Sequence, residues 1–181
     1  MSATRAAIAL GSNLNNTQAQ VEAAFVELGA LPSTELLERS ALYRTAPVGY
    51  LDQPWFVNAC ALVETTLTPR ELLEALLAIE RSHGRVRDIP NGPRTLDLDI
   101  VTYGEQAIAE PGLTIPHPRA HERAFVLAPL LQVWPDATLA AKGRADECLA
   151  RMGSEGVERI VDSEAPRAQS SDRRPRGNRR A

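Results

Sequence analysis

The sequence predicts an α+β fold, a single domain built on a ferredoxin-like antiparallel sheet with helices packed on one face. Strand-like and helix-like apolar patterns follow in the order strand, helix, strand, strand, helix, strand, which is the split βαβ arrangement. The 181 residues suit one domain with a sizeable core. Such a sheet leaves its second face free for a ligand.

The first half of this pattern starts near the N-terminus. Ala6–Leu10 is a short apolar run that ends in Gly-Ser-Asn, which predicts a strand followed by a turn. Apolar residues recur at helical spacing over Val21–Leu28, and Gly29 is expected to close that helix. Leu36–Arg44 suits a second strand.

The second half begins with clear alternation over Trp55–Glu64, where Val57, Ala59, Ala61 and Val63 face one way and Phe56, Asn58 and Cys60 the other. Thr68–Glu71 is a capping box with proline at the first helical position, and it predicts a helix that ends before Gly84. Thr95–Tyr103 suits a further strand, and Arg123–Val133 suits a final helix.

Charge is distributed unevenly along the chain. Residues 165–181 carry +5 from six arginines and one acid, which leaves −8 on residues 1–164 of a net −3. We expect residues 1–161 to form the domain and residues 162–181 to be a disordered arginine-rich tail, either merely solvated or weakly associated with an anion such as RNA. The acidic domain argues against nucleic acid as its main partner.

Other features exclude further classes. No run of eighteen apolar residues occurs, so no membrane span is expected, and no signal-peptide cleavage region is evident. Cys60 and Cys148 match no zinc or redox spacing. We therefore expect a cytoplasmic monomer with free thiols.

Two acids, Asp97 and Asp99, alternate with apolar residues in the segment 94–100. Positions i and i+2 of a strand share a face about 6.6 Å apart, so both carboxylates project side by side. Adjacent carboxylates repel unless a cation compensates, and oxygen ligands of this kind suit Mg²⁺ together with substrate phosphates. Two such ions can clamp both oxygens of a phosphoryl displacement. Taken alone, the pair also suits a solvent-exposed strand face.

Arginines surround this pair in the sequence. Arg85 and Arg87 share a face of an extended segment, and Arg94 precedes the acidic strand. Guanidinium groups bind phosphate oxygens bidentately, so the cluster suits a polyphosphate with its metal. Salt bridges that only neutralise the strand are the alternative. No Gly-rich P-loop motif is present.

Two further segments could bind ligands. His117 lies between prolines and could contact a nucleotide, although a lone histidine is more often structural. The proline- and glycine-punctuated loop from Tyr43 leads into a strand that presents Phe56 and Asn58 on one face. A ring beside a carboxamide suits a flat heterocycle, and an ordinary loop is equally possible.

These blocks, in this order, resemble the 6-hydroxymethyl-7,8-dihydropterin pyrophosphokinase family. The resemblance spans about residues 6–135 and lies in the stretches 9–14, 43–49, 52–58, 84–87, 92–100, 113–118 and 123–125. The stretch 92–100 is highly specific. The tail lies outside the resemblance.

The resemblance implies a single α+β domain that binds ATP as co-substrate with two Mg²⁺ ions and transfers diphosphate to 6-hydroxymethyl-7,8-dihydropterin in folate biosynthesis. By motif, Asp97 and Asp99 hold the metals and join Arg85 and Arg94 as catalytic residues. The nucleotide side comprises Glu80, Arg87, Arg94, Ile100, Thr114, His117 and Arg123. The pterin side comprises Thr45, Pro47, Val48, Phe56, Asn58 and Phe125.

Two other functions fit the residues. Another two-metal nucleotide-dependent transferase, such as a nucleotidyltransferase, would release pyrophosphate in place of AMP. A non-catalytic ferredoxin-like ligand-binding module would bind without turnover, although a pure binder need not keep two repelling acids.

Overall fold

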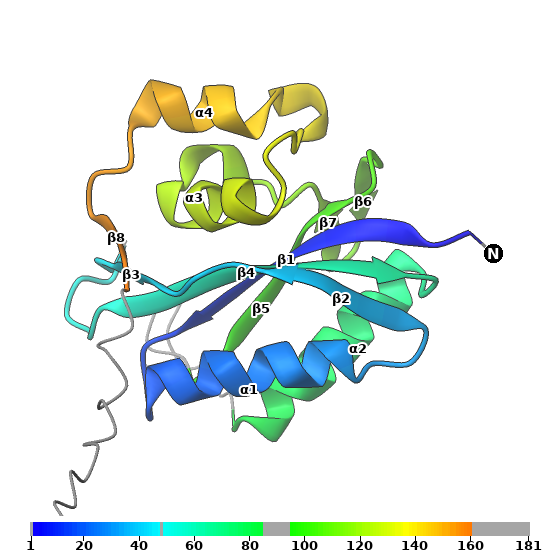
Figure 1. Ribbon diagram of the computed structural model, residues 1–181, viewed down its shortest axis with the longest axis horizontal. Helices are drawn as coiled ribbons and strands as arrows, with labels where there is room; N and C mark the ends of the chain where they lie inside the picture. The colour runs from blue at the N-terminus through cyan, green and yellow to red at the C-terminus, as the bar shows by residue number, and fades with distance from the viewer. Residues whose placement is uncertain (1, 48, 85–94, 161–181) are drawn as a thin grey trace, which may run out of the picture.

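The computed structural model of the chain describes residues 2–47, 49–84 and 95–160. They form three layers, with a six-stranded antiparallel sheet in the middle (Figure 1). Helices α1 (Thr17–Gly29) and α2 (Pro69–Ser82) cover one face. Helices α3 (Ala124–Val133) and α4 (Ala145–Met152) lie over the other.

The sheet has the order β5-β1-β4-β3-β8, and β2 also pairs with β4. Its strands are β1 (Thr4–Ser12), β2 (Thr34–Arg39), β3 (Tyr43–Thr45), β4 (Phe56–Thr65), β5 (Asp97–Tyr103) and β8 (Val157–Arg159). A separate hairpin comprises β6 (Ile108–Glu110) and β7 (Leu113–Ile115), and two short 3-10 helices are η1 (Ala120–Glu122) and η2 (Ala140–Lys142). All these strand pairs are antiparallel, which confirms the predicted α+β class.

The first core lies between the sheet and helices α1 and α2. Val21 and Phe25 of α1 and Leu72 and Leu76 of α2 are buried there against alternate residues of β1, β4 and β5. The predicted capping box is present, because the Thr68 side chain accepts from the Glu71 amide while the Glu71 carboxylate accepts from the Thr68 amide. The helix therefore begins where the sequence predicts.

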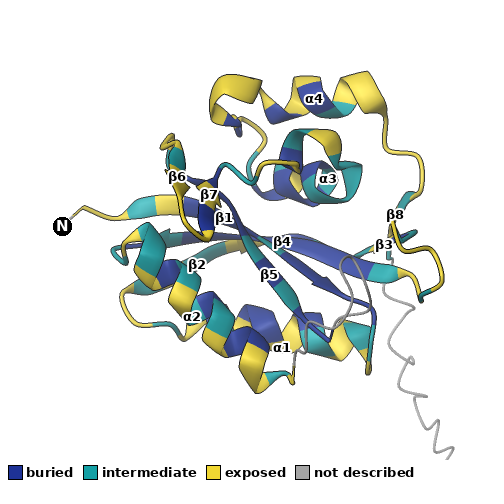
Figure 2. Ribbon diagram, turned by 180° about the vertical axis from the view of Figure 1, so that it is seen from behind, coloured by how far each residue is buried: buried dark blue, intermediate teal, exposed yellow. Residues whose placement is uncertain are grey.

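The expectation of helices on one face only was wrong. Leu127, Leu130 and Val133 of α3 bury a second core against the opposite face of the sheet, where Cys60 and Leu62 of β4 lie. Figure 2 shows the central strands as buried ribbon between two helical layers. A strand with apolar residues on both faces needs cover on both, and α3 supplies it here.

The second predicted strand, 36–44, is interrupted. The chain forms β2 up to Arg39 and resumes pairing with β4 only at Tyr43. Between them, the Ser40 amide donates to the Cys60 carbonyl at 2.9 Å, and the Ser40 hydroxyl accepts from the Cys60 amide at 2.8 Å. Ser40 therefore keeps one backbone bond to β4, and its side chain supplies the second.

Within the described ranges, no helix combines the length and hydropathy that crossing a bilayer requires. The two cysteines, Cys60 and Cys148, are buried free thiols, and burial raises the pKa of Cys60 to about 12. The arginine-rich tail, residues 162–181, lies outside the described residues.

Candidate active site

One cavity opens on the sheet face that carries α3, beyond the area that this helix covers. Its walls come from β1, β3, β4 and β5, from the segment that leads into α3 and from the first turn of α3. The lining residues are Ala9, Leu10, Gly11, Thr45, Ala46, Gly49, Phe56, Asn58, Ala59, Asp97, Asp99, Val101, His117, Arg119, Arg123, Phe125 and Val126. The cavity therefore gathers segments that are far apart in the sequence.

Strand register explains why acids and a carboxamide meet here. Gly11 of β1 pairs with Asn58 of β4 on one side and with Asp97 of β5 on the other. Two residues earlier, Ala9 pairs with Asp99. Because β1 contributes only small residues to this face, the side chains of its neighbours have room above the central strand.

The predicted side-by-side placement of Asp97 and Asp99 is confirmed. Both line the cavity and are half-buried, whereas Leu98 and Ile100 are buried in the core on the opposite face. Alternation along a strand produces this separation. Val101, which follows Asp99 on the same face of β5, belongs to the second core under α3. The two acids therefore lie just outside that apolar contact.

Asn58 is held in one orientation. Its Nδ2 donates to Thr45 Oγ1 at 2.6 Å, and the residue is only 8% exposed. Its Oδ1 lies above Gly11, 2.8 Å from where a Cβ on that glycine would stand. Phe56 and Phe125 also line the cavity, and the Arg123 guanidinium lies 5.5 Å from the centroid of the Phe125 ring.

His117 lies on the acidic side of the cavity. Its backbone amide donates to the Val101 carbonyl at 3.0 Å, and its Nδ1 accepts from the Arg119 amide at 3.2 Å. Burial lowers the pKa of His117, Arg123 and Arg119 lower it further, and Asp97 opposes them. These effects together favour the neutral ring, and the Arg119 contact at Nδ1 places its N–H at Nε2.

The two carboxylates fit a magnesium site. Among the described residues, no group of three or more histidine, cysteine or acidic side chains converges on a point. Mg²⁺ is instead commonly bound through one or two carboxylates, with water and substrate phosphates completing its shell. Asp97 and Asp99, half-buried on one face and within one cavity, supply such a pair.

The structure brings together eight of the residues predicted from sequence, namely Thr45, Phe56, Asn58, Asp97, Asp99, His117, Arg123 and Phe125. Four described residues do not line the cavity: Pro47, Glu80, Ile100 and Thr114. The Ile100 side chain is in the opposite core, Thr114 is exposed on β7, and Glu80 is 3% exposed with Oε1 accepting from the Leu98 amide at 2.8 Å. Val48, Arg85, Arg87 and Arg94 lie outside the described residues.

Sequence reasoning did not assign a role to Ser12, which ends β1 beside the site, or to Asn13, which follows it. The Ser12 hydroxyl, completely buried, donates to the Thr95 carbonyl at 2.5 Å. Asn13 Nδ2 donates to Gln53 Oε1 and to the Pro54 carbonyl, both at 2.9 Å. One turn thus anchors the residues before the acidic strand and those before Phe56.

Comparisons with known proteins agree with this geometry. Residues 7–135 match the family model described as 7,8-dihydro-6-hydroxymethylpterin-pyrophosphokinase (HPPK). The chain is similar to the 2-amino-4-hydroxy-6-hydroxymethyldihydropteridine pyrophosphokinases of Pseudomonas aeruginosa and Methylorubrum extorquens. Identity to the first is 47% over 156 residues, which is 86% of this chain and 96% of the relative. Identity to the second is 41% over 157 residues, which is 87% and 99%.

A fold comparison points the same way. The structure of wild-type HPPK-DHPS from Plasmodium falciparum superposes with a TM-score of 0.70 at 14% identity, covering 87% of this chain and 47% of that one. The chain thus spans about half of that solved structure, and at this identity the likeness concerns the fold alone. From the family match and the two bacterial relatives, the chain belongs to the 7,8-dihydro-6-hydroxymethylpterin-pyrophosphokinase family.

Proposed function

We propose that this protein transfers the diphosphate of ATP to the hydroxymethyl group of 6-hydroxymethyl-7,8-dihydropterin, releasing AMP, in folate biosynthesis. One observation carries the proposal: the paired acids Asp97 and Asp99 share a cavity with the carboxamide of Asn58 and the rings of Phe56 and Phe125. The acids suited to phosphate and metal and the residues suited to a heterocycle therefore line the same cavity.

The pterin is expected at Asn58. Asn58 Oδ1 can accept from ring N–H or amino groups of the pterin, while one N–H of Nδ2 donates to Thr45. Phe56 and Phe125 provide flat apolar surfaces for the bicyclic ring. Pro47 and Val48 are proposed for the same side from the family resemblance.

The nucleotide is expected on the side of His117 and Arg123. The neutral His117 can donate from Nε2 to a phosphate oxygen, and Arg123 offers a charged donor beside it. Arg85, Arg87 and Arg94 are proposed to hold the phosphates, with Thr114, Glu80 and Ile100 nearby. For Ile100 this role falls to the backbone, because its side chain is in the core.

Asp97 and Asp99 would hold two Mg²⁺ ions between the substrates, and bound Mg²⁺ would supply positive charge that offsets the charge of the phosphates. The protein contributes mainly orientation: it aligns the hydroxyl of the pterin with the phosphorus that it attacks. Excluding water protects ATP from hydrolysis.

We also infer that the β1-α1-β2-β4-α2-β5 part of the domain is a ferredoxin-like core. The order β5-β1-β4 with β2 on β4 supports this inference, as does the placement of both crossover helices on one face. The helices α3 and α4 are then additions that bury the second face. We expect residues 1–161 to work as a monomer.

The test is a product assay with the purified chain, ATP, Mg²⁺ and 6-hydroxymethyl-7,8-dihydropterin. AMP should form only when the pterin and Mg²⁺ are both present. Release of pyrophosphate would indicate a nucleotidyltransferase, and tight pterin binding without any product would indicate a binding module. Either result would overturn the proposal.

A further inference from the structure

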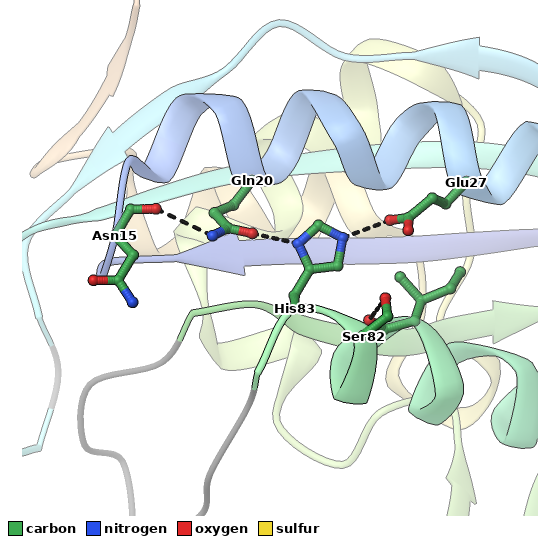
Figure 3. Close-up of polar contacts among 6 residues, drawn as sticks. Asn15, Gln20, Glu27, Ser82 and His83 are labelled. Carbon is green, nitrogen blue, oxygen red and sulfur yellow. Dashed lines mark hydrogen bonds and ion pairs between the residues drawn. The ribbon is translucent and has the colours of Figure 1, made fainter.

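His83 ends α2 and joins this helix to α1 (Figure 3). Its Nδ1 contacts Gln20 Oε1, and its Nε2 lies 2.5 Å from Glu27 Oε2. The side chain is only 12% exposed. Two residues of α1, about two turns apart, therefore contact one imidazole ring.

The partners on α1 define the chemistry of this ring. Gln20 Nε2 donates to the Asn15 carbonyl at 3.1 Å, so the oxygen of the Gln20 amide must face His83. Glu27 presents a carboxylate oxygen to the other ring nitrogen. Both groups accept hydrogen bonds, and only the imidazolium form of histidine has two N–H donors. The contacts are complete when the ring is protonated.

The last turn of α2 also contacts β5, the strand that carries Asp97 and Asp99. Glu80 lies one turn before His83 and accepts from the Leu98 amide, between Asp97 and Asp99. The backbone amide of His83 in turn donates to the carbonyls of Ile79 and Glu80, at 3.2 Å and 3.1 Å. Because β5 is an edge strand of the sheet, the hydrogen bond from Leu98 to Glu80 of α2 helps to position the carboxylates of β5.

We propose that His83 is a positioning residue: as an imidazolium it clamps the end of α2 to α1, and through Glu80 and Leu98 it fixes the acid pair. Loss of either ring contact weakens the clamp, so the last turn of α2 loosens and the Leu98 amide is less well held. The pair should then bind divalent cations less tightly.

The charged groups of the two helices near this junction are few. On α1 they are Glu22 and Glu27, and at the end of α2 they are Glu80 and Arg81. Glu22 forms an ion pair with Arg39, and Glu80 accepts from Leu98, whereas Glu27 contacts the ring. Glu27 is thus the carboxylate that contacts the His83 ring.

A direct test is amide hydrogen exchange of the ligand-free protein, followed by NMR. The His83→Leu variant should lower the protection of the Leu98 amide about threefold or more, while that of Ala61 in the central strand changes little. His83→Arg, which keeps N–H donors and the positive charge, should restore the protection.

Two more variants make the result decisive. His121→Leu removes an imidazole that lies away from this junction, where its Nε2 is 3.4 Å from Glu122 Oε1. This variant should leave the protection of the Leu98 amide unchanged. If His83→Leu does not fold, Glu27→Gln keeps the shape of the partner and removes its charge. It should then lower the protection of the Leu98 amide. Equal protection at Leu98 in the natural sequence, His83→Leu and Glu27→Gln would overturn the proposal.

Activity provides a second readout, which rests on the proposed function. The Mg²⁺ concentration that gives half-maximal AMP formation should rise about threefold or more in His83→Leu, with recovery in His83→Arg. A merely structural residue would lower the melting temperature and leave this concentration unchanged. If no variant forms AMP, the proposed function fails, and the exchange experiment still decides the role of His83.

Discussion

Gly11 and Asn58 face each other across β1 and β4 so closely that a Cβ on Gly11 would stand 2.8 Å from Asn58 Oδ1. This oxygen is the acceptor proposed for the pterin. Only glycine therefore fits at position 11 without moving its neighbour, and every larger residue there must displace the Asn58 side-chain amide.

Replacing Gly11 by alanine tests this relationship. Because the added methyl pushes Asn58 from its place, the KM for the pterin should rise about 10-fold to about 100-fold, with a smaller change in the KM for ATP. Steady-state kinetics with each substrate varied will measure both constants. Gly29→Ala is the matched control, since its Cβ would make an ordinary 3.6 Å contact with Leu36. An unchanged pterin KM in Gly11→Ala would refute the role of Asn58.

The Asp97→Asn variant tests the metal assignment. It keeps the size of the side chain and removes the charge, so the rate of AMP formation should fall about 100-fold or more. Pterin binding measured by calorimetry should persist, because Asn58 and the two phenylalanines are untouched. Asp136→Asn, at a side chain that is 86% exposed, serves as the control. Near-normal turnover of Asp97→Asn in Mg²⁺ would contradict the assignment.

Asn13 should stabilise the fold as well as the site. Replacing it by alanine removes two hydrogen bonds from a residue that is 2% exposed and leaves the Pro54 carbonyl without this donor. A loss of about 1–3 kcal/mol in the free energy of unfolding is expected, measured by urea denaturation. Gln18→Ala, at an exposed position of α1, should change it little. Equal stability of both variants would show that the Asn13 contacts contribute little.

His117 should make stability depend on pH on the acidic side. Its pKa is lowered in the folded state, chiefly by burial and then by Arg123. The unfolded chain therefore takes up the proton first as the pH falls below the ordinary histidine value, and folded stability decreases. The melting temperature should thus drop more steeply with acid in the natural sequence than in His117→Gln. Parallel curves between about pH 7 and about pH 5 would contradict a lowered pKa.

The sequence correctly predicted those elements whose signals come from residues close together in the chain. The capping box before α2 and the alternation of β4 and β5 involve neighbours in the sequence, and the structure contains each of them. Asp97 and Asp99 could be assigned to one face for the same reason. The cover of the second face could not be predicted locally, because Cys60 and Leu62 show what they contact only once α3 is in place.

The residues that support the site, Ser12 and Asn13, could not be predicted from a local pattern either. Asn13 reaches residues 40 and 41 positions away, and Ser12 reaches Thr95, 83 positions away. A Gly-Ser-Asn turn suggests the end of a strand, but it does not say which loops the side chains will hold. Likewise, the need for glycine at position 11 follows from strand register with Asn58 and Asp97.

A crystal structure with Mn²⁺ in place of Mg²⁺, a non-hydrolysable ATP analogue and the pterin tests the central claim most directly. We expect anomalous peaks for two cations in contact with the carboxylates of Asp97 and Asp99, and the pterin amino group within hydrogen-bonding distance of Asn58 Oδ1. Cations bound elsewhere, with both carboxylates turned away from the phosphates, would contradict the account.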